Sequence, residues 1–372
     1  MSIEPLEFTA GWDEENISLA VDYSPPLLEQ AGKIAIIACI LWNPIVGSLF
    51  FTSYVGYKSF GHMVNRKAHQ MMLPSAHRIE EEQIEMKNHF SQFWEGPITD
   101  ENRAIRERFD LIHSKVTTPD GAELKVMWIK HKNADQKTRT TLYFNGNFQI
   151  CEQFPASVFE EAVKTDQCCS FILFNYRGVD GSTGNATRFN DLVLDGHSVL
   201  QWIRRGLNIA DDNINFYGFS LGGVVAAHTQ ALSPDKLIGP HVNHNSFGNS
   251  DKMIYSRCGK GIAGWITNWL FEWQGYSANS AEAFRKLQGE KLIVLNPNDW
   301  IIPYHVSLQA EVQHDNVIEL HPKAIFREVS ARLKHHATPL ECHEGVREKI
   351  WDFLYKVQDV SRKHFRQAAN AA

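Results

Sequence analysis

A serine flanked by glycines is the feature that most limits how this chain can fold. The segment 218–222 reads Gly-Phe-Ser-Leu-Gly, follows an apolar run at 214–217 and precedes small residues at 223–227. A strand, a sharp turn and a helix are therefore predicted, as in a G-x-S-x-G nucleophile elbow, with Ser220 at the carboxyl end of a parallel strand. An ordinary glycine-rich turn is the alternative, unless an oxyanion loop precedes the motif and an acid and a histidine follow it in that order.

From residue 111 onward, short apolar runs alternate with helical stretches. Two runs at 112–118 and 123–130 flank Pro119-Asp120-Gly121 and predict a β-hairpin. Repeated β-α-β units with right-handed crossovers give a mostly parallel, doubly wound sheet, so the fold class is α/β. Further strands are expected at 140–144, 170–175, 213–217, 236–244, 291–296 and 316–320.

Composition excludes several classes of protein. With 372 residues, 43% hydrophobic and 22% charged, the chain is globular and long enough for one large core with additions. The formal net charge of −6 argues against a nucleic-acid partner, and six cysteines without a C-x-x-C pair indicate reduced thiols. Three histidines and a cysteine lie within 335–343, so a metal site is an alternative there. No second ligand cluster accompanies them, and we expect no metal and no cofactor.

The loop after the first parallel strand can supply an oxyanion hole. Such a hole needs backbone N–H groups close to developing negative charge, and Gly146 permits that approach. We expect the donors to be the amides of Leu221 and of Asn147 or its neighbour. A plain turn at the strand end is the alternative.

An acid and a base are expected downstream of the serine. Asp299 is the acid at the carboxyl end of the run at 291–296, where it would hold a histidine in the correct tautomer; helix capping is its alternative role. The base should precede the final helix, where His335, His336 and His343 all lie. The His-x-x-Pro spacing before that helix favours His336, which completes a serine, histidine and aspartate triad.

The segments 175–179, 182–184 and 191–196, together with the Ser220 motif, resemble the α/β-hydrolase superfamily. The resemblance covers about residues 111–360 and implies an α/β-hydrolase fold with serine hydrolase activity. More narrowly, the chain is similar to the chlamydial CHLPS-type and Legionella effector-like hydrolases, which also carry an apolar N-terminal region.

Two positions depart from the usual superfamily pattern. Asp180 stands where relatives often have glycine, and Asn145 stands where a histidine often precedes the oxyanion-loop glycine. Three charged residues of the shared segments are expected to be structural rather than catalytic: Arg177, Asp191 and Asp195.

The N-terminal part has its own character. The run 34–57 contains no ionisable residue except one cysteine and two tyrosines, and it is long enough to cross a bilayer as a helix. Because Asn43-Pro44 interrupts it, an interfacial or re-entrant segment and a buried helical hairpin are alternatives. Seven acids and one base precede it, unlike a signal peptide, and bases after it favour a cytosolic remainder if it inserts. Apolar residues at helical spacing predict an amphipathic helix at 77–95, ended by Gly96-Pro97.

A lid is expected at about 248–285. Trp265, Trp269 and Trp273 follow one another at a spacing of four, so one helical face should carry three indoles. They could line an acyl-chain pocket, rest on a membrane surface or pack on the body of the protein.

Together these features predict four regions: an acidic and apolar helical segment at 1–75, a helical linker at 76–110, a catalytic domain at 111–360 and a tail at 361–372. The expected function is cleavage of an acyl ester or thioester by a serine hydrolase, in the cytosol or at a cytosol-facing membrane. The expected partners are a small-molecule or lipid ester and, through 34–57, a membrane; the narrower resemblance implies delivery into a host cell. A hydrolase-fold scaffold with little turnover is the alternative, although a scaffold has no physical need for all three triad residues.

Overall fold

The computed structural model describes residues 6–11, 13, 59, 63, 66, 73, 81–153, 161–165, 167–233, 239–332 and 334–355. The apolar run at 34–57 and the tail at 361–372 lie outside these ranges. Among the described residues, no helix combines the length and the hydrophobicity needed to cross a membrane.

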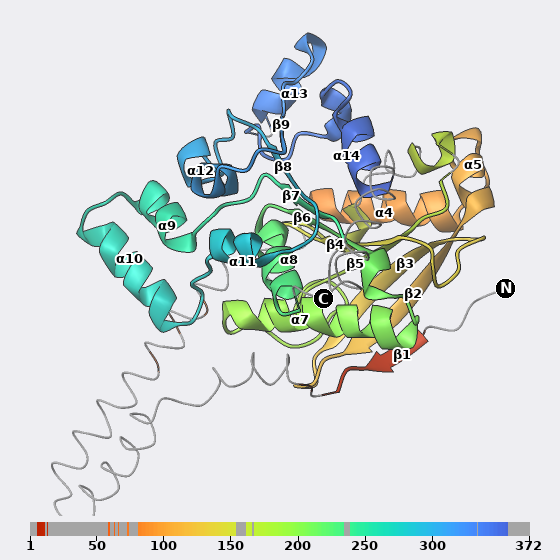
Figure 1. The fold of residues 1–372 in the computed structure, drawn as a ribbon, viewed down its shortest axis with the longest axis horizontal. Coiled ribbons are helices and arrows are strands. Elements are labelled where there is room, and N and C mark those ends of the chain that lie inside the picture. The colour runs from red at the N-terminus through yellow and green to blue at the C-terminus, as the bar shows by residue number, and fades with distance from the viewer. Residues whose placement is uncertain are drawn as a thin grey trace, which may run out of the picture.

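The described strands form one nine-stranded sheet. They are β1 (Leu6–Thr9), β2 (Phe109–Thr117), β3 (Glu123–His131), β4 (Thr140–Phe144), β5 (Ser170–Phe174), β6 (Ile214–Phe219), β7 (His241–His244), β8 (Lys291–Leu295) and β9 (Val317–Glu319). Their spatial order is β1-β2-β3-β5-β4-β6-β7-β8-β9 (Figure 1). Only β3 among them runs against the others, because it pairs antiparallel with β2 and β5 while the remaining pairs are parallel.

This sheet confirms the mostly parallel α/β class and the hairpin, which spans β2 and β3. The expected strands appear with ends shifted by a few residues, and the run at 236–244 contributes β7 only from His241. β1 was not expected. It pairs with β2 in parallel, through Leu6 opposite Ser114.

Helices cover both faces of the sheet (Figure 1). On one face lie α7 (Phe189–Gln201) and α8 (Leu221–Ala231), and on the other lie α4 (Glu81–Glu95) and α14 (Val346–Tyr355). The remaining described α-helices are α5 (Asp100–Arg108), α9 (Ser250–Cys258), α10 (Ile262–Trp273), α11 (Ser280–Lys286), α12 (Leu308–Val312) and α13 (Arg327–Arg332). The expected amphipathic helix is therefore present as α4, with Phe90 and Trp94 buried.

The strand β6 shows how the sheet divides the apolar core. Neighbouring side chains of a strand point to opposite faces. Phe216 belongs to the core that contains residues of α7 and α8, whereas Tyr217 belongs to the core that contains residues of α4 and α14. Packing on both faces of the sheet thus fixes the carboxyl end of β6, which Ser220 follows.

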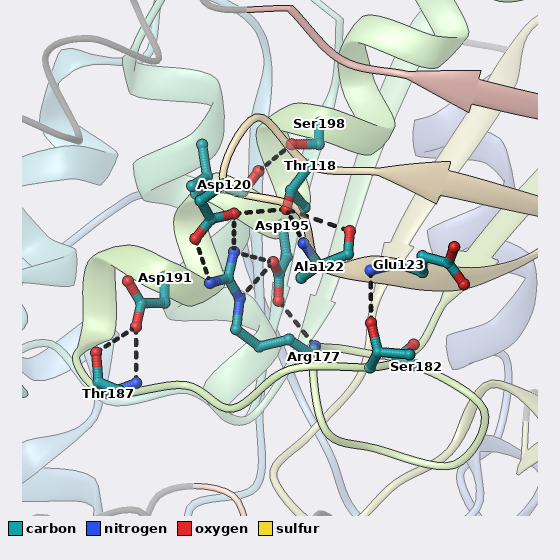
Figure 2. A network of polar contacts seen from close by, with 12 residues as sticks. Thr118, Asp120, Ala122, Glu123, Arg177, Ser182, Thr187, Asp191, Asp195 and Ser198 are labelled. Carbon is teal, nitrogen blue, oxygen red and sulfur yellow. Dashed lines mark hydrogen bonds and ion pairs between the residues drawn. The ribbon is translucent and has the colours of Figure 1, made fainter.

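Arg177 and its partners form the polar network drawn in Figure 2. The guanidinium donates to Asp195 at 2.8 Å and to Asp120 at 2.7 and 3.2 Å, and the Arg177 amide donates to Asp195 at 2.9 Å. Burial raises the pKa of Asp195 to about 6 against the effect of Arg177. Asp191 accepts from the backbone and hydroxyl of Thr187. These contacts join the hairpin and the loop after β5 to α7, which is a structural role.

Asp180 connects α4 to the body of the protein. Its carboxylate accepts from the ammonium groups of Lys87 at 2.8 Å and Lys125 at 3.0 Å, and Lys125 also pairs with Glu152. Burial alone would raise the pKa of Asp180, but the two lysines outweigh burial and lower it. The departure from glycine at this position thus provides the attachment point of a helix.

A buried histidine should make the fold sensitive to acid. His241 is fully buried in β7, with Nδ1 2.8 Å from Gln230 Oε1, and burial lowers its pKa to about 3. The unfolded chain takes up a proton on this histidine near pH 6.5 and the folded protein does not. His241 therefore stabilises the fold above pH 6.5, and this stability is lost as the pH falls toward 3, by about 2 kcal/mol at pH 5.

Between pH 7.5 and pH 5, the free energy of unfolding should fall by about 2 kcal/mol less in His241→Phe than in the unmodified protein. Urea unfolding at the two pH values measures the difference. Exchange of the exposed His305 for glutamine is the control and should leave the difference unchanged. Equal losses in His241→Phe and the unmodified protein would refute the assignment.

Candidate active site

Ser220 stands in the turn between β6 and α8, as the motif predicts. Its φ of 54° lies in the left-handed region, which is strained for a residue with a side chain. A Cβ atom on Gly218 would lie 2.4 Å from the Gly222 carbonyl oxygen, and one on Gly222 would lie 2.0 Å from the Phe144 carbonyl oxygen. The turn therefore requires glycine at both positions, and the predicted strand, turn and helix are confirmed.

We expect Gly222→Ala to destabilise the protein by more than about 3 kcal/mol, because the new methyl group meets the backbone of β4. Gly261→Ala is a matched control, since a Cβ atom there has no neighbour within 4 Å. Because Gly261 is the N-cap of α10, where alanine is less favourable than glycine, the control should cost no more than about 1 kcal/mol. Urea unfolding of both variants checks the comparison, and similar stabilities would contradict it.

His336 lies between Ser220 and Asp299. Its Nε2 is 2.9 Å from Ser220 Oγ and its Nδ1 is 2.6 Å from Asp299 Oδ2. All three side chains are buried. The carboxylate accepts from Nδ1–H, which leaves Nε2 to accept from the serine hydroxyl.

The second oxygen of Asp299 has a separate role. Oδ1 accepts from the amides of Ile301 at 2.7 Å and Ile302 at 3.0 Å. The two roles weighed for this residue, capping a turn and orienting a histidine, thus use different oxygens of one carboxylate. The backbone bonds fix the direction in which the other oxygen faces His336.

Asn245 was missed from the sequence and holds two loops of the site together. It follows β7, has a φ of 47°, donates from Nδ2 to the His336 carbonyl at 2.7 Å and accepts from the Asn296 amide at 2.8 Å. A polar residue directly after a strand, at the sheet edge that carries Ser220, was the available signal.

The other two histidines considered as the base have different surroundings. His335 Nδ1 is 2.7 Å from Ser330 Oγ, and His343 is buried beside a bridge to Pro322. Burial lowers the pKa of His343. Within the described residues, no group of three or more histidines, cysteines or acids is arranged to hold a metal ion.

The loop after β4 reaches the serine. Gly146 donates its amide to Gln149 Oε1 at 2.9 Å, so its N–H is already engaged. Asn147 and Leu221 line the same pocket as Ser220. Leu221 is the first residue of α8, and an amide at that position has no partner within its helix. Asn145 donates to the Phe174 carbonyl at 2.8 Å, so it ties the loop to β5.

A pocket of about 160 Å³ opens beside Ser220. Of the described residues that line it, only Arg257 is charged, and its guanidinium donates to the carbonyls of Trp300 and Ile301. The apolar lining comes from Leu221, α9, α10 and nearby loops: Leu221, Phe247, Met253, Ile254, Phe271, Ile301 and Ile302.

The tryptophans of α10 do not line this pocket, which corrects one expectation. Trp265 and Trp269 are 60% and 48% exposed, and Trp269 stacks on Trp273 with ring centroids 5.8 Å apart. Helix α10 turns Thr267 and Phe271 toward the pocket instead. Two of the three indoles, those of Trp265 and Trp269, are thus exposed, whereas Trp273 is half-buried.

Comparisons with known proteins place this geometry in context. An uncharacterized protein, R595, of Acanthamoeba polyphaga mimivirus is 24% identical over 211 residues, which cover 54% of this chain and 68% of that protein. The Pyrococcus furiosus esterase Pf2001 is 17% identical, with a TM-score of 0.46, over 66% of this chain and 90% of that one. Acetyl xylan esterase 1 from Thermoanaerobacterium sp. JW/SL YS485 is 16% identical, with a TM-score of 0.44, over 67% and 94% of the two chains.

The sheet order, the strained serine turn and the loops at the carboxyl edge are those of an α/β-hydrolase fold. The model of one protein family, described as Chlamydia CHLPS protein (DUF818), matches residues 77–313. That range includes α4, Ser220 and Asp299 and covers more than half of the sequence. The chain therefore belongs to the Chlamydia CHLPS protein (DUF818) family.

Proposed function

We propose that this chain is a serine hydrolase that cleaves an ester or thioester with a compact apolar acyl group. The observation that carries the proposal is the continuous contact from Asp299 through His336 to Ser220, at 2.6 and 2.9 Å. A serine held at a positive φ beside a pocket supports it, because such strain clusters at functional positions.

In the proposed reaction, Ser220 Oγ attacks the carbonyl carbon while His336 Nε2 takes the hydroxyl proton. The amides of Leu221 and Asn147 stabilise the tetrahedral oxygen. Collapse expels the alcohol or thiol, which takes the proton from His336, and leaves an acyl-enzyme. Water then attacks the acyl carbon, His336 takes its proton and returns it to Ser220, and the acid departs. Asp299 stabilises the imidazolium in both steps.

The pocket supports a compact acyl group. Its volume of about 160 Å³ is below the range of about 300–1,000 Å³ in which whole small molecules bind. Its lining is mostly apolar, and the charge of Arg257 is directed to backbone carbonyls. A short apolar acyl chain is therefore favoured over a charged or peptide substrate.

Labelling by a fluorophosphonate probe tests the proposal, because the probe reacts with an activated serine. The purified protein should be labelled and Ser220→Ala should not. Ser250→Ala is the matched control, since Ser250 lines the same pocket, and it should retain labelling. An unlabelled wild-type protein, under conditions where a known esterase reacts, would favour the scaffold alternative.

Helix α4 should influence the rate through the oxyanion loop. Gln83 is buried and its Nε2 donates to the Phe148 carbonyl at 2.6 Å, one residue beyond Asn147. We expect Gln83→Leu to lower kcat by about 3- to 10-fold with little change in KM, because the loop loses this support and the amide of Asn147 shifts. Steady-state kinetics on a soluble p-nitrophenyl ester measure this, with the exposed Ile84→Ala as control; equal kcat values in both variants would contradict it.

A further inference from the structure

A second and larger cavity lies between the sheet and helices α4 and α14. Its volume is about 490 Å³, and no described residue lines both this cavity and the pocket beside Ser220. That volume falls within the range of sites that hold whole small molecules. The protein thus has room for a ligand that the smaller pocket does not accommodate.

The lining of this cavity is mainly aromatic and apolar. It includes side chains from three strands and from α14: Tyr143, Phe171, Tyr217, Phe219, Trp351 and Tyr355. Met86 of α4 and Phe148 also line it and are 43% and 44% exposed, so they mark its entrance. Such a lining favours an apolar ligand, because binding removes apolar surface from water.

Two residues that line the cavity each carry a buried nitrogen with no hydrogen-bond partner among the described residues: Trp351 Nε1 and His244 Nε2. Both residues are more than nine-tenths buried. An unsatisfied buried donor costs about 1–3 kcal/mol, so such groups generally have partners.

Each of the two nitrogens can act as a donor. The indole N–H can only donate. His244 Nδ1 is 2.8 Å from the Tyr217 hydroxyl, and burial lowers the pKa of His244 to about 3, so the ring is neutral. When the hydroxyl donates to Nδ1, the proton of His244 is on Nε2. Either nitrogen could therefore donate to an acceptor oxygen on a ligand.

The charges on the wall favour an uncharged ligand. Among the described residues that line the cavity, only Arg347 carries a full charge, and its Nε is 3.4 Å from Glu161 Oε2. A ligand anion would therefore enter an apolar space in which the one cation is already paired, at a large cost in desolvation.

We propose that this cavity binds an uncharged molecule with an apolar body and a carbonyl oxygen, and that the oxygen accepts from Trp351 or His244. The site is separate from the reacting serine, and binding does not require turnover. The cavity nevertheless borders the triad. Phe219 and residues 337–339 line the cavity, and the Phe219 ring centroid is 5.1 Å from that of His336.

The experiment uses the full chain with Ser220→Ala, so that an ester ligand is not hydrolysed. The probe is methyl 11-bromoundecanoate, because bromine quenches the fluorescence of a tryptophan that it contacts. We expect saturable quenching at one ester per chain, most of which disappears in Ser220→Ala/Trp351→Phe. Absence of saturable quenching, or tighter binding of the free 11-bromoundecanoate acid at pH 8, would overturn the proposal.

Three lysine substitutions in the same background locate the ligand. Met86→Lys places a charge at the entrance and should weaken binding of the ester by at least about tenfold. Ile84→Lys is the matched control, because Ile84 is 47% exposed on the same helix and does not line the cavity, and it should leave affinity unchanged. Equal weakening by both would indicate surface adsorption, and weakening by Met253→Lys instead would place the ester beside residue 220; either result refutes the site.

Discussion

Replacing Ser220 with alanine should lower kcat/KM for a p-nitrophenyl ester by about 10⁵- to 10⁶-fold. The proposed reaction passes through an acyl-enzyme on Ser220 Oγ, and no other hydroxyl lies at 2.9 Å from the base in the described structure. A small rate above that of water should remain, because the oxyanion amides and the pocket still bind the reacting group. Stopped assays with high enzyme concentration measure the residual rate.

Two features of this variant make the result decisive. The side chain of Ser220 is small and alanine keeps the backbone turn, so the thermal unfolding midpoint should shift by only a few degrees. Ser250→Ala should keep enough activity for ordinary assays, since the Ser250 hydroxyl accepts from the Ala278 amide and is not the group that donates to His336. Residual activity of Ser220→Ala above about 1% would mean that another residue is the nucleophile.

Asp299→Asn should lower kcat by about 10⁴-fold while leaving the fold intact. Asparagine can still accept from the amides of Ile301 and Ile302, so the turn is retained. Its NH₂ group then faces His336 Nδ1, which can only accept from it, and the imidazole proton moves to Nε2. In that tautomer His336 cannot take the proton of Ser220.

The neighbouring Asn298→Ala is the control for this prediction, because the Asn298 side chain is exposed and it is the backbone N–H of Asn298 that donates to Asn296 Oδ1, at 3.0 Å. Its kcat should stay within about twofold. Steady-state kinetics measure the loss of activity, and circular dichroism shows whether the variant is still folded. A fall of less than tenfold in Asp299→Asn would indicate that the carboxylate serves the turn alone.

The sequence predicts those parts of the protein that depend on local pattern and on chain order. The motif around Ser220 is local in part, because a Cβ atom on Gly218 would meet the backbone of Gly222 within the same turn. The positions of Asp299 and His336 follow from the rule that parallel strands end at one edge of a sheet, so loops after β6, β8 and β9 meet there.

Contacts between distant segments could not be predicted. Lys87 and Asp180 are 93 residues apart, and nothing near either one indicates the partner. β1 has four residues and pairs with a strand more than 100 positions later, so neither its length nor its pattern identifies it. The cavity bounded by α4 and α14 is a property of packing between elements, which periodicity does not describe.

The orientation of α10 shows a different limit. The spacing of Trp265, Trp269 and Trp273 predicts a shared face, but a helix with apolar residues around most of its circumference has two candidate inner faces. Asn268 and Phe271 are buried, whereas Trp265 and Trp269 are exposed. The spacing of apolar residues identifies the apolar faces of a helix, and only the contacts with neighbouring elements decide which face is buried.

The attachment of α4 through Asp180 has an evolutionary consequence. Lys87, Lys125, Asp180 and Glu152 balance two positive with two negative charges, and both carboxylates are largely removed from water. Loss of Lys87 alone would leave two acids sharing one lysine, and such a substitution is selected against until position 180 also changes. Related sequences should therefore exchange positions 87 and 180 together, and those with glycine at 180 should join the helix to the sheet by other residues.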